Sequence, residues 1–266
     1  MRITRRDFGL MAGSAAVARA DGLTAGDVVQ RLLGEGATIT VGDPAMPVRG
    51  IATTAMATVD VLRQAAKQNA NLVLTYEPAF FSKAERPMPD DPVYSAKKEF
   101  IEKNGLVVAR VTKIPNMLEG LADSLGWSKH RVKAGDALYE IPAASAEQTV
   151  AAIRSKLNLR GGLRAVGDRK AQVRRVLLHP GPMTPAIMWA RYTEVDMVVA
   201  GEVREWENTH YAADIFTAGQ KRNLVTVGRV MSEDPGMRLF AESLKSVVKE
   251  APATFIAAGD AYWRAV

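Results

Sequence analysis

Short apolar runs alternate along the chain with segments whose apolar residues recur at helical spacing. A run of about four to eight apolar residues between turn residues is typical of a buried strand, whereas a period of about 3.6 residues is typical of a helix with one buried face. The predicted strands are 71–74, 106–111, 137–141, 173–178, 195–203, 224–228 and 254–257. The predicted helices are 59–68, 95–103, 117–125, 146–157, 205–218 and 234–248. This alternation favours an α/β protein with mostly parallel strands.

The extent of the alternation indicates how the chain divides. It covers most of the 266 residues, which is long enough for one large domain or two lobes. We expect two layered α/β lobes with a cleft between them. The first lobe is expected to comprise 21–128 and 221–266, and the second 129–220.

Composition narrows the possible classes of protein. Hydrophobic residues make up 47% of the chain and charged residues 24%, as in ordinary globular proteins. The chain contains no cysteine, which excludes disulfides and thiolate metal ligands. The net charge is +6, but the first twenty residues hold four arginines against one aspartate. No basic run is interleaved with aromatic residues, so we expect no nucleic-acid partner.

The N-terminus has the pattern of a twin-arginine signal peptide. Residues 4–8 read TRRDF, an apolar stretch follows from Phe8 to Val17, and Ala18-Arg19-Ala20 fits a cleavage site. We therefore expect a mature chain that begins near Asp21 and is exported to the bacterial periplasm or beyond. The alternative is a cytosolic protein whose first residues are basic by chance. No later stretch of about 18 apolar residues occurs, so no membrane span is expected after the signal is removed.

Polar clusters follow three of the predicted strands. The carboxyl ends of parallel strands are where open α/β sheets bind ligands, so these clusters are candidates for a common site. Each could instead be the N-terminal cap of the next helix, where the helix dipole favours acidic residues. Among the three histidines, His179 lies closest to such a strand end, although a structural role is the simpler interpretation. The clusters are 75–78 (TYEP), 201–206 (GEVREW) and 228–233 (GRVMSE).

Four stretches, in this order, resemble one known family. They read GDPAMPVRGIATTAMATVDVLRQAAKQNANLVLTYEPAFF (42–81), GLADSLGW (120–127), GEVREWENTHYAADI (201–215) and GRVMSEDPGM (228–237). They are similar to motifs of the NGG-one-interacting-factor-three family, whose members are often called GTP cyclohydrolase 1 type 2 homologues. The resemblance covers nearly all of the mature chain. It implies two α/β lobes, a centre of two divalent metal ions in the cleft, and often a toroidal hexamer.

Compared position by position, the metal ligands that the resemblance implies are only partly retained. Tyr76 stands where the family has the first histidine of its T-H-[HE]-P motif, while Glu77 keeps an acidic residue. Lys113 stands where a branch of the family has a ligand carboxylate. Arg229 replaces the histidine of the G-H-x-x-S-E motif, in which Glu233 is retained. Protonated lysine and arginine have no lone pair for a metal, so we expect a degenerate centre and no metal cofactor.

The two lost ligand positions suggest an internal replacement for the metals. We expect Lys113 and Arg229 to act as fixed cations for Glu77 and Glu233, with at least one ion pair within about 4 Å. Tyr76 is expected to line this cluster and to form hydrogen bonds with it. The alternative is that these side chains point to solvent on separate surfaces.

Three functional hypotheses remain from the sequence. The favoured one is an exported, metal-free binding or assembly protein that forms a homo-oligomer and takes an unidentified small-molecule ligand. The second is a hydrolase that depends on divalent metals and recruits Glu202, Glu205 or His179 as other ligands. The third is an unrelated periplasmic α/β binding protein, which the matched motifs disfavour.

Overall fold

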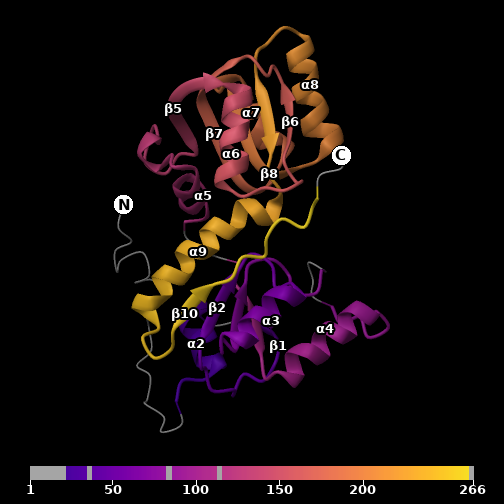
Figure 1. Cartoon of the computed structure of the whole chain (residues 1–266), viewed down its shortest axis with the longest axis vertical. Coiled ribbons are helices and arrows are strands. Elements are labelled where there is room, and N and C mark those ends of the chain that lie inside the picture. Colours follow the sequence, from indigo (N-terminus) through magenta and orange to yellow (C-terminus); the bar gives the residue numbers. More distant parts are fainter. Residues whose placement is uncertain (1–21, 35–37, 82–85, 113–115, 264–266) are drawn as a thin grey trace. The chain divides into compact units, whose positions relative to one another are not determined.

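The chain forms two compact α/β units (Figure 1). The computed structural model describes residues 22–34, 38–81, 86–112 and 116–263. Unit 1 comprises Met1–Pro115 and Met237–Ala258, and unit 2 comprises Asn116–Gly236 and Gly259–Val266. Each unit contains one five-stranded sheet with helices packed on it. The predicted α/β fold of two lobes is confirmed.

Unit 1 is built on a mostly parallel sheet. Its strand order is β1-β4-β3-β2-β10, and every neighbouring pair except β1–β4 is parallel. The strands are β1 (Ile39–Val41), β2 (Ile51–Thr54), β3 (Leu72–Thr75), β4 (Val107–Arg110) and β10 (Ala253–Phe255). The helices are α2 (Ala25–Leu33), α3 (Val59–Lys67), α4 (Pro92–Lys103) and the C-terminal part of α9 (Arg229–Val247).

Helices pack on both faces of the sheet in unit 1. On one face, Ala52 and Val73 share a buried cluster with Leu62 of α3 and Ile101 of α4. On the opposite face, the Thr53 hydroxyl donates a hydrogen bond of 2.8 Å to the carbonyl oxygen of Met237 in α9. Side chains alternate between the faces of a strand, so the four buried residues of β2 contact both layers.

Unit 2 is built on a mixed sheet. Its strand order is β5-β7-β8-β9-β6, in which β7–β8 and β8–β9 are parallel and both edge strands are antiparallel to their neighbours. The strands are β5 (Leu138–Ser145), β6 (Arg164–Gly167), β7 (Gln172–Met183), β8 (Met197–Val203) and β9 (Asn223–Thr226). The helices are α5 (Met117–Leu125), α6 (Ala146–Lys156), α7 (Pro185–Arg191), α8 (His210–Thr217) and the first part of α9. Three shorter helical segments are η1 (Ser128–His130), η2 (Tyr192–Glu194) and the π-helix η3 (Glu205–Thr209).

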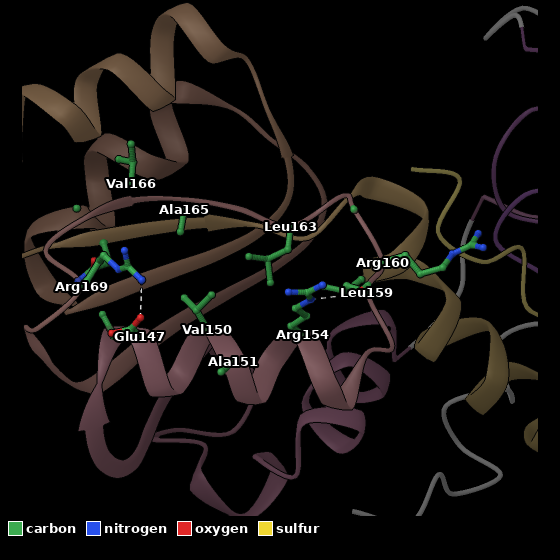
Figure 2. A pocket seen from close by; sticks show the side chains of 14 residues that line it. Glu147, Val150, Ala151, Arg154, Leu159, Arg160, Leu163, Ala165, Val166 and Arg169 are labelled. Carbon is green, nitrogen blue, oxygen red and sulfur yellow. Dashed lines mark hydrogen bonds and ion pairs between the residues drawn. The ribbon is translucent and has the colours of Figure 1, made fainter. Parts of the chain in front are cut away.

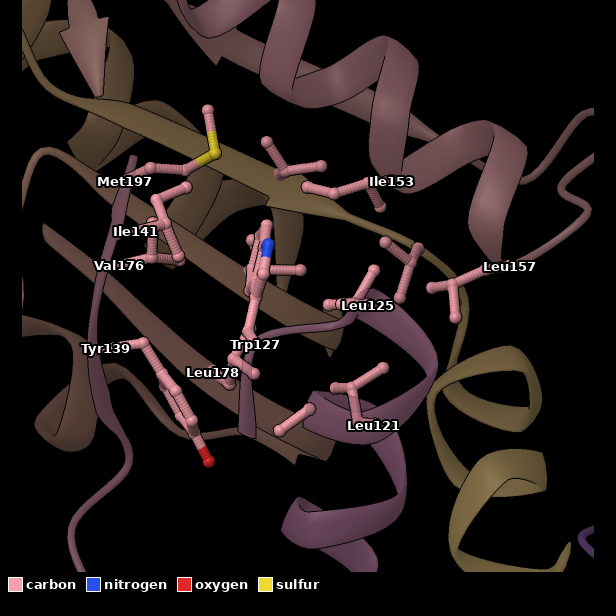
Figure 3. Close-up of a cluster of buried hydrophobic side chains, with 14 of the residues drawn as sticks. Leu121, Leu125, Trp127, Tyr139, Ile141, Ile153, Leu157, Val176, Leu178 and Met197 are labelled. Carbon is pink, nitrogen blue, oxygen red and sulfur yellow. The ribbon is translucent and has the colours of Figure 1, made fainter. Parts of the chain in front are cut away.

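The alternation of side chains along β7 shows that the sheet in unit 2 is covered on both faces. Leu178 joins a buried cluster with Leu121 of α5 and Ile153 of α6 (Figure 3). The preceding residue, Leu177, joins a second cluster with Met188 of α7. Unit 2 therefore has three layers, with helices on either side of the sheet.

Two elements, β7 and α9, differ most in extent from the sequence prediction. Strand β7 continues through the HPGP segment to Met183 rather than ending at Leu178, with an irregular register between His179 and Pro182. An irregular ladder accommodates prolines, which have no N–H to donate. Helix α9 begins at Arg229 rather than Asp234, so Pro235 lies inside it. Pro235 cannot donate to the carbonyl of Met231, and the helix continues without that bond.

The boundaries of the two units also differ from the predicted ones. We expected boundaries at 128/129 and 220/221, whereas the structure has them at 115/116, 236/237 and 258/259, so that residues 259–266 belong to unit 2 rather than to the first lobe. Helix α5 belongs to unit 2 because Leu121 and Leu125 lie in its core. Strand β9 belongs to unit 2 because it pairs with β8 and β6.

Two further predictions concern membranes and export. Within the described ranges, no helix is long and apolar enough to cross a membrane. The predicted twin-arginine signal and its cleavage site lie in residues 1–21, outside the described residues.

Candidate functional site

The Tyr76-Glu77 dipeptide follows β3 in unit 1, and its backbone is firmly held. The N–H of Tyr76 donates to Thr54 O at 3.1 Å, and the N–H of Glu77 donates to Ala55 O at 2.8 Å. The Thr75 hydroxyl donates to Glu77 O at 3.0 Å. Glu77 is buried, with 8% of its surface exposed. The sequence therefore places an acidic side chain in the interior at the carboxyl end of a parallel strand.

A cation that the sequence analysis did not propose lies beside this dipeptide. Arg110 ends β4, the strand adjacent to β3, and its Nε donates to Tyr76 O at 3.2 Å. Its position at the end of a neighbouring parallel strand is the signal that could have identified it. Lys113, the cation predicted for this side of the site, lies outside the described residues.

In unit 2, Arg229 lies between two carboxylates. Its Nε is 3.4 Å from Glu233 Oε1, and its Nη1 is 3.3 Å from Glu202 Oε1. The Glu233 side chain is 1% exposed, whereas those of Arg229 and Glu202 are 35% and 50% exposed. One guanidinium thus pairs with a buried and a half-exposed carboxylate, and both distances are within the usual reach of an ion pair.

Two glycines and a serine fix the start of α9 against the ends of β7 and β8. The Ser232 hydroxyl accepts a hydrogen bond of 2.9 Å from Gly181 N and donates one of 2.6 Å to Arg229 O. A Cβ at Gly181 would lie 2.9 Å from Glu233 Oε1, and one at Gly201 would lie 2.6 Å from Gly181 O. Gly181 also has φ +72°, a conformation that favours glycine. This packing was not predicted, although Gly201 and Ser232 lie in the polar clusters 201–206 and 228–233.

The remaining predicted site residues have other surroundings. His179 is half-buried on β7, opposite Ala200 of β8, and burial lowers the pKa of its imidazole. Glu205 is exposed and pairs with Arg164 of β6. The structure therefore brings Glu202, Arg229 and Glu233 together, which we call the Arg229 cluster.

The residues around Arg229 do not fit the two metal ions that the family resemblance implies. A guanidinium has no lone pair, and at 3.4 Å from Glu233 it would repel a divalent ion bound to that carboxylate. Among the described residues, no three histidine, cysteine, aspartate or glutamate side chains are grouped so that they could hold a metal ion. The Arg229 cluster is thus a set of ion pairs in which a guanidinium lies beside the retained Glu233.

The fold and the Arg229 cluster define a two-unit α/β protein with a cluster of acidic and basic residues on β8 and α9. A model of the family described as Duf34/NIF3 (NGG1p interacting factor 3) matches residues 36–259. The chain belongs to this Duf34/NIF3 family. No curated protein matches the chain.

Solved structures share the fold at low sequence identity. The Staphylococcus aureus hypothetical protein SA1388 has a TM-score of 0.71 at 13% identity, over 92% of this chain and 100% of that chain. A Bacillus cereus protein related to NIF3 has a TM-score of 0.68 at 15% identity, over 87% and 94%. Reduced HcgD from Methanocaldococcus jannaschii has a TM-score of 0.57 at 13% identity, over 88% and 97%. These similarities concern the fold.

Proposed function

We propose that this chain is an exported Duf34/NIF3 protein in which fixed cations replace the metals of a dinuclear centre. The observation that carries the proposal is the position of the Arg229 guanidinium, 3.4 Å from the buried Glu233 and 3.3 Å from Glu202. Arg229 stands where the family resemblance implies a ligating histidine. The protein then acts as a metal-free binding or assembly protein rather than as a metal-dependent hydrolase.

Electrostatics supports this proposal. A buried carboxylate requires a compensating charge, because it has lost the solvation that it has in water. In a metal centre the ions provide this charge, and here the ion pair with Arg229 provides it for Glu233. Arginine remains protonated at any physiological pH and pairs well with carboxylates. The replacement would thus keep the acidic residue while removing the need for metal.

The half-exposed groups of the Arg229 cluster indicate what such a protein could bind. Arg229 can donate hydrogen bonds to an anionic group of a ligand, and Glu202 can accept them from a donor on the same ligand. We therefore propose a small polar ligand that carries both an anionic group and a hydrogen-bond donor. Binding of such a ligand requires no catalysed reaction.

Self-association is part of the same proposal. Trp189 of α7, Trp206 of η3 and Phe216 of α8 are 51%, 70% and 45% exposed. Aromatic residues are enriched in protein interfaces. A mass of at least two mature chains, measured by light scattering at micromolar concentration, would support the assembly, and a monomeric mass would contradict it.

A ligand-restoration experiment tests the proposed replacement. The double variant Arg229→His with Lys113→Asp restores two ligand types of the family, and we expect it to bind Mn²⁺ or Zn²⁺ in calorimetric titration where the unchanged protein does not. The control Arg63→His with Lys98→Asp makes the same changes at two exposed residues of unit 1. Equal binding by both double variants, or binding by neither, would contradict the replacement.

A further inference from the structure

A cavity of about 500 Å³ lies within unit 2, between α6 and β6 (Figure 2). Cavities of roughly 300–1,000 Å³ are typical of small-molecule sites. The cavity shares no lining residue with the Arg229 cluster. Its walls come from α6, from the loop that joins α6 to β6, from the edge strand β6 and from the first residue of β9.

Part of the cavity wall is apolar. Figure 2 shows Val150 of α6 facing Leu163 and Ala165 across the space between the helix and the strand. Val150 and Leu163 are only partly buried, although both pack against the hydrophobic cluster beneath them. A ligand with an apolar body would remove more of this surface from water.

The cationic groups of the cavity are not balanced by its acidic ones. Arg169 pairs with Glu147 near the start of α6. Arg154, on the last turn of α6, donates from Nε to Leu159 O at 3.3 Å, and among the described residues it has no carboxylate partner. Figure 2 shows this side chain beside Leu163. Two terminal guanidinium nitrogens are therefore left to bind an anion next to an apolar surface.

A buried amide at the cavity wall also lacks a partner. Asn223 of β9 lines the cavity and is 4% exposed, and its Nδ2 makes no hydrogen bond with any residue that the structure describes. A buried donor without a partner is destabilising. An acceptor oxygen on a bound ligand would satisfy this donor once the amide turned toward it.

The loop on one side of the cavity is held in place. The N–H groups of Arg160, Gly161 and Gly162 donate to Asp260 Oδ2 at 2.8, 3.0 and 3.1 Å. Three successive N–H groups that converge on one carboxylate oxygen form an anion-binding nest. Asp260 already occupies this nest, and the guanidinium of Arg160 donates to the backbone carbonyl oxygen of Asp260, so Arg154 is the cation that we expect to meet a ligand's anion. The fixed loop lowers the ordering that binding would require.

We propose that this cavity binds a small amphipathic anion. Its carboxylate or phosphate group pairs with Arg154, and its apolar body lies against Val150, Leu163 and Ala165. The inference rests on the cavity alone and does not depend on the proposed replacement of metals.

Calorimetric titration with simple probes tests this proposal. Hexanoate and hexyl phosphate carry both features, hexanol lacks the charge, and acetate and inorganic phosphate lack the apolar body. We expect at least one of the two amphipathic anions to bind. The affinities for hexanol, acetate and inorganic phosphate should be at least tenfold lower. The comparison of hexanoate with hexyl phosphate shows which anionic group the cavity prefers.

Three variants locate the binding. Arg154→Gln should weaken binding of the amphipathic anion about tenfold or more, because it removes a charge-assisted interaction. Ala165→Leu should weaken it by filling the cavity. Arg174→Gln, on an exposed residue of β7 outside the cavity, should leave it unchanged. Thermal unfolding confirms that each variant is folded. No binding of either anion, hexanol binding as tight as hexanoate, or an Arg154→Gln affinity within twofold of the unchanged protein would overturn the proposal.

Discussion

Arg229 is the residue on which the proposed replacement of metals depends. Replacing it with alanine removes its ion pairs with Glu233 and Glu202. The Glu233 side chain, which is 1% exposed, would then lose this compensating charge. We expect Arg229→Ala to lower the free energy of unfolding by about 1–3 kcal/mol, less than for a fully buried pair because Arg229 is 35% exposed.

Urea unfolding at pH 7 measures this change in unit 2. All four tryptophans, at positions 127, 189, 206 and 263, lie in that unit, so their fluorescence reports its unfolding. The control is Arg174→Ala, whose partner Glu140 is half-exposed, and it should change the free energy by less than about 0.5 kcal/mol. Equal effects of the two substitutions would contradict the role given to Arg229.

Asp260 is expected to make the stability of unit 2 depend on pH. Burial acts to raise the pKa of its carboxyl, but hydrogen bonds from the N–H groups of Gly161, Gly162 and Tyr262 outweigh this and hold the pKa below its ordinary value. A lowered folded-state pKa adds stability above the unfolded-state pKa of about 3.9, and this is lost as pH falls through the folded-state value.

The substitution Asp260→Asn should therefore destabilise unit 2 at pH 7, by about 1–3 kcal/mol. The difference from the unchanged protein should shrink as the pH falls below about 4, since the carboxyl then becomes neutral as well. Urea unfolding from pH 7 to pH 3 tests this expectation. A difference that stays constant over the range would show that the charge of Asp260 is not responsible.

At the scale of elements, local signals fix the ends of several helices. The Ser145 side chain accepts from Gln148 N, and the Gln148 side chain accepts from Ser145 N, which together form a capping box at the start of α6. We expect Ser145→Ala to reduce stability by about 1 kcal/mol. Ser155→Ala, at an exposed position near the other end of the helix, should change it by less than about 0.5 kcal/mol. Tryptophan fluorescence during unfolding measures both, and equal losses would show that the cap does not contribute.

Such local signals explain which elements could be predicted from the sequence. Helix α5 was predicted with its exact bounds, and α6 to within one residue, because caps and periodicity are local. Helices α2 and α7 were not predicted, although Thr24 with Asp27 and Thr184 with Pro185 are helix-start signals. Strand β6 is mostly exposed and pairs only with β9, far along the chain, so local patterns could not identify it.

The candidate site shows the same division between local and long-range information. Glu233 and Arg229 are four residues apart on α9, so their pairing follows from helical spacing. The contact of Arg229 with Glu202 joins residues 27 positions apart and depends on the packing of α9 on β8. Gly181 lies close to Glu233 because β7 continues past Leu178 to Met183. The sequence prediction ended this strand before the prolines, so it could not place Gly181 there.

For the whole molecule, the twin-arginine pattern at the N-terminus predicts export. Replacing both Arg5 and Arg6 with lysine should abolish export of the folded chain and leave the precursor in the cytoplasm. Replacing Arg2 with lysine should not, because it lies outside the TRRDF motif. Cell fractionation and the mass of the mature chain, expected to begin at Asp21, test this. Unchanged location and mass in the double variant would show that the N-terminus is not a twin-arginine signal.

The replacement of metals by fixed cations is the central claim about the whole molecule. Metal analysis of the mature protein, purified without chelators and without added metal, tests it most directly. The proposal predicts far less than one zinc, iron or manganese ion per chain, because Arg229 already pairs with Glu233. It also predicts that chelation leaves the unfolding temperature unchanged. Two tightly bound ions per chain, together with a lower unfolding temperature after their removal, would contradict it.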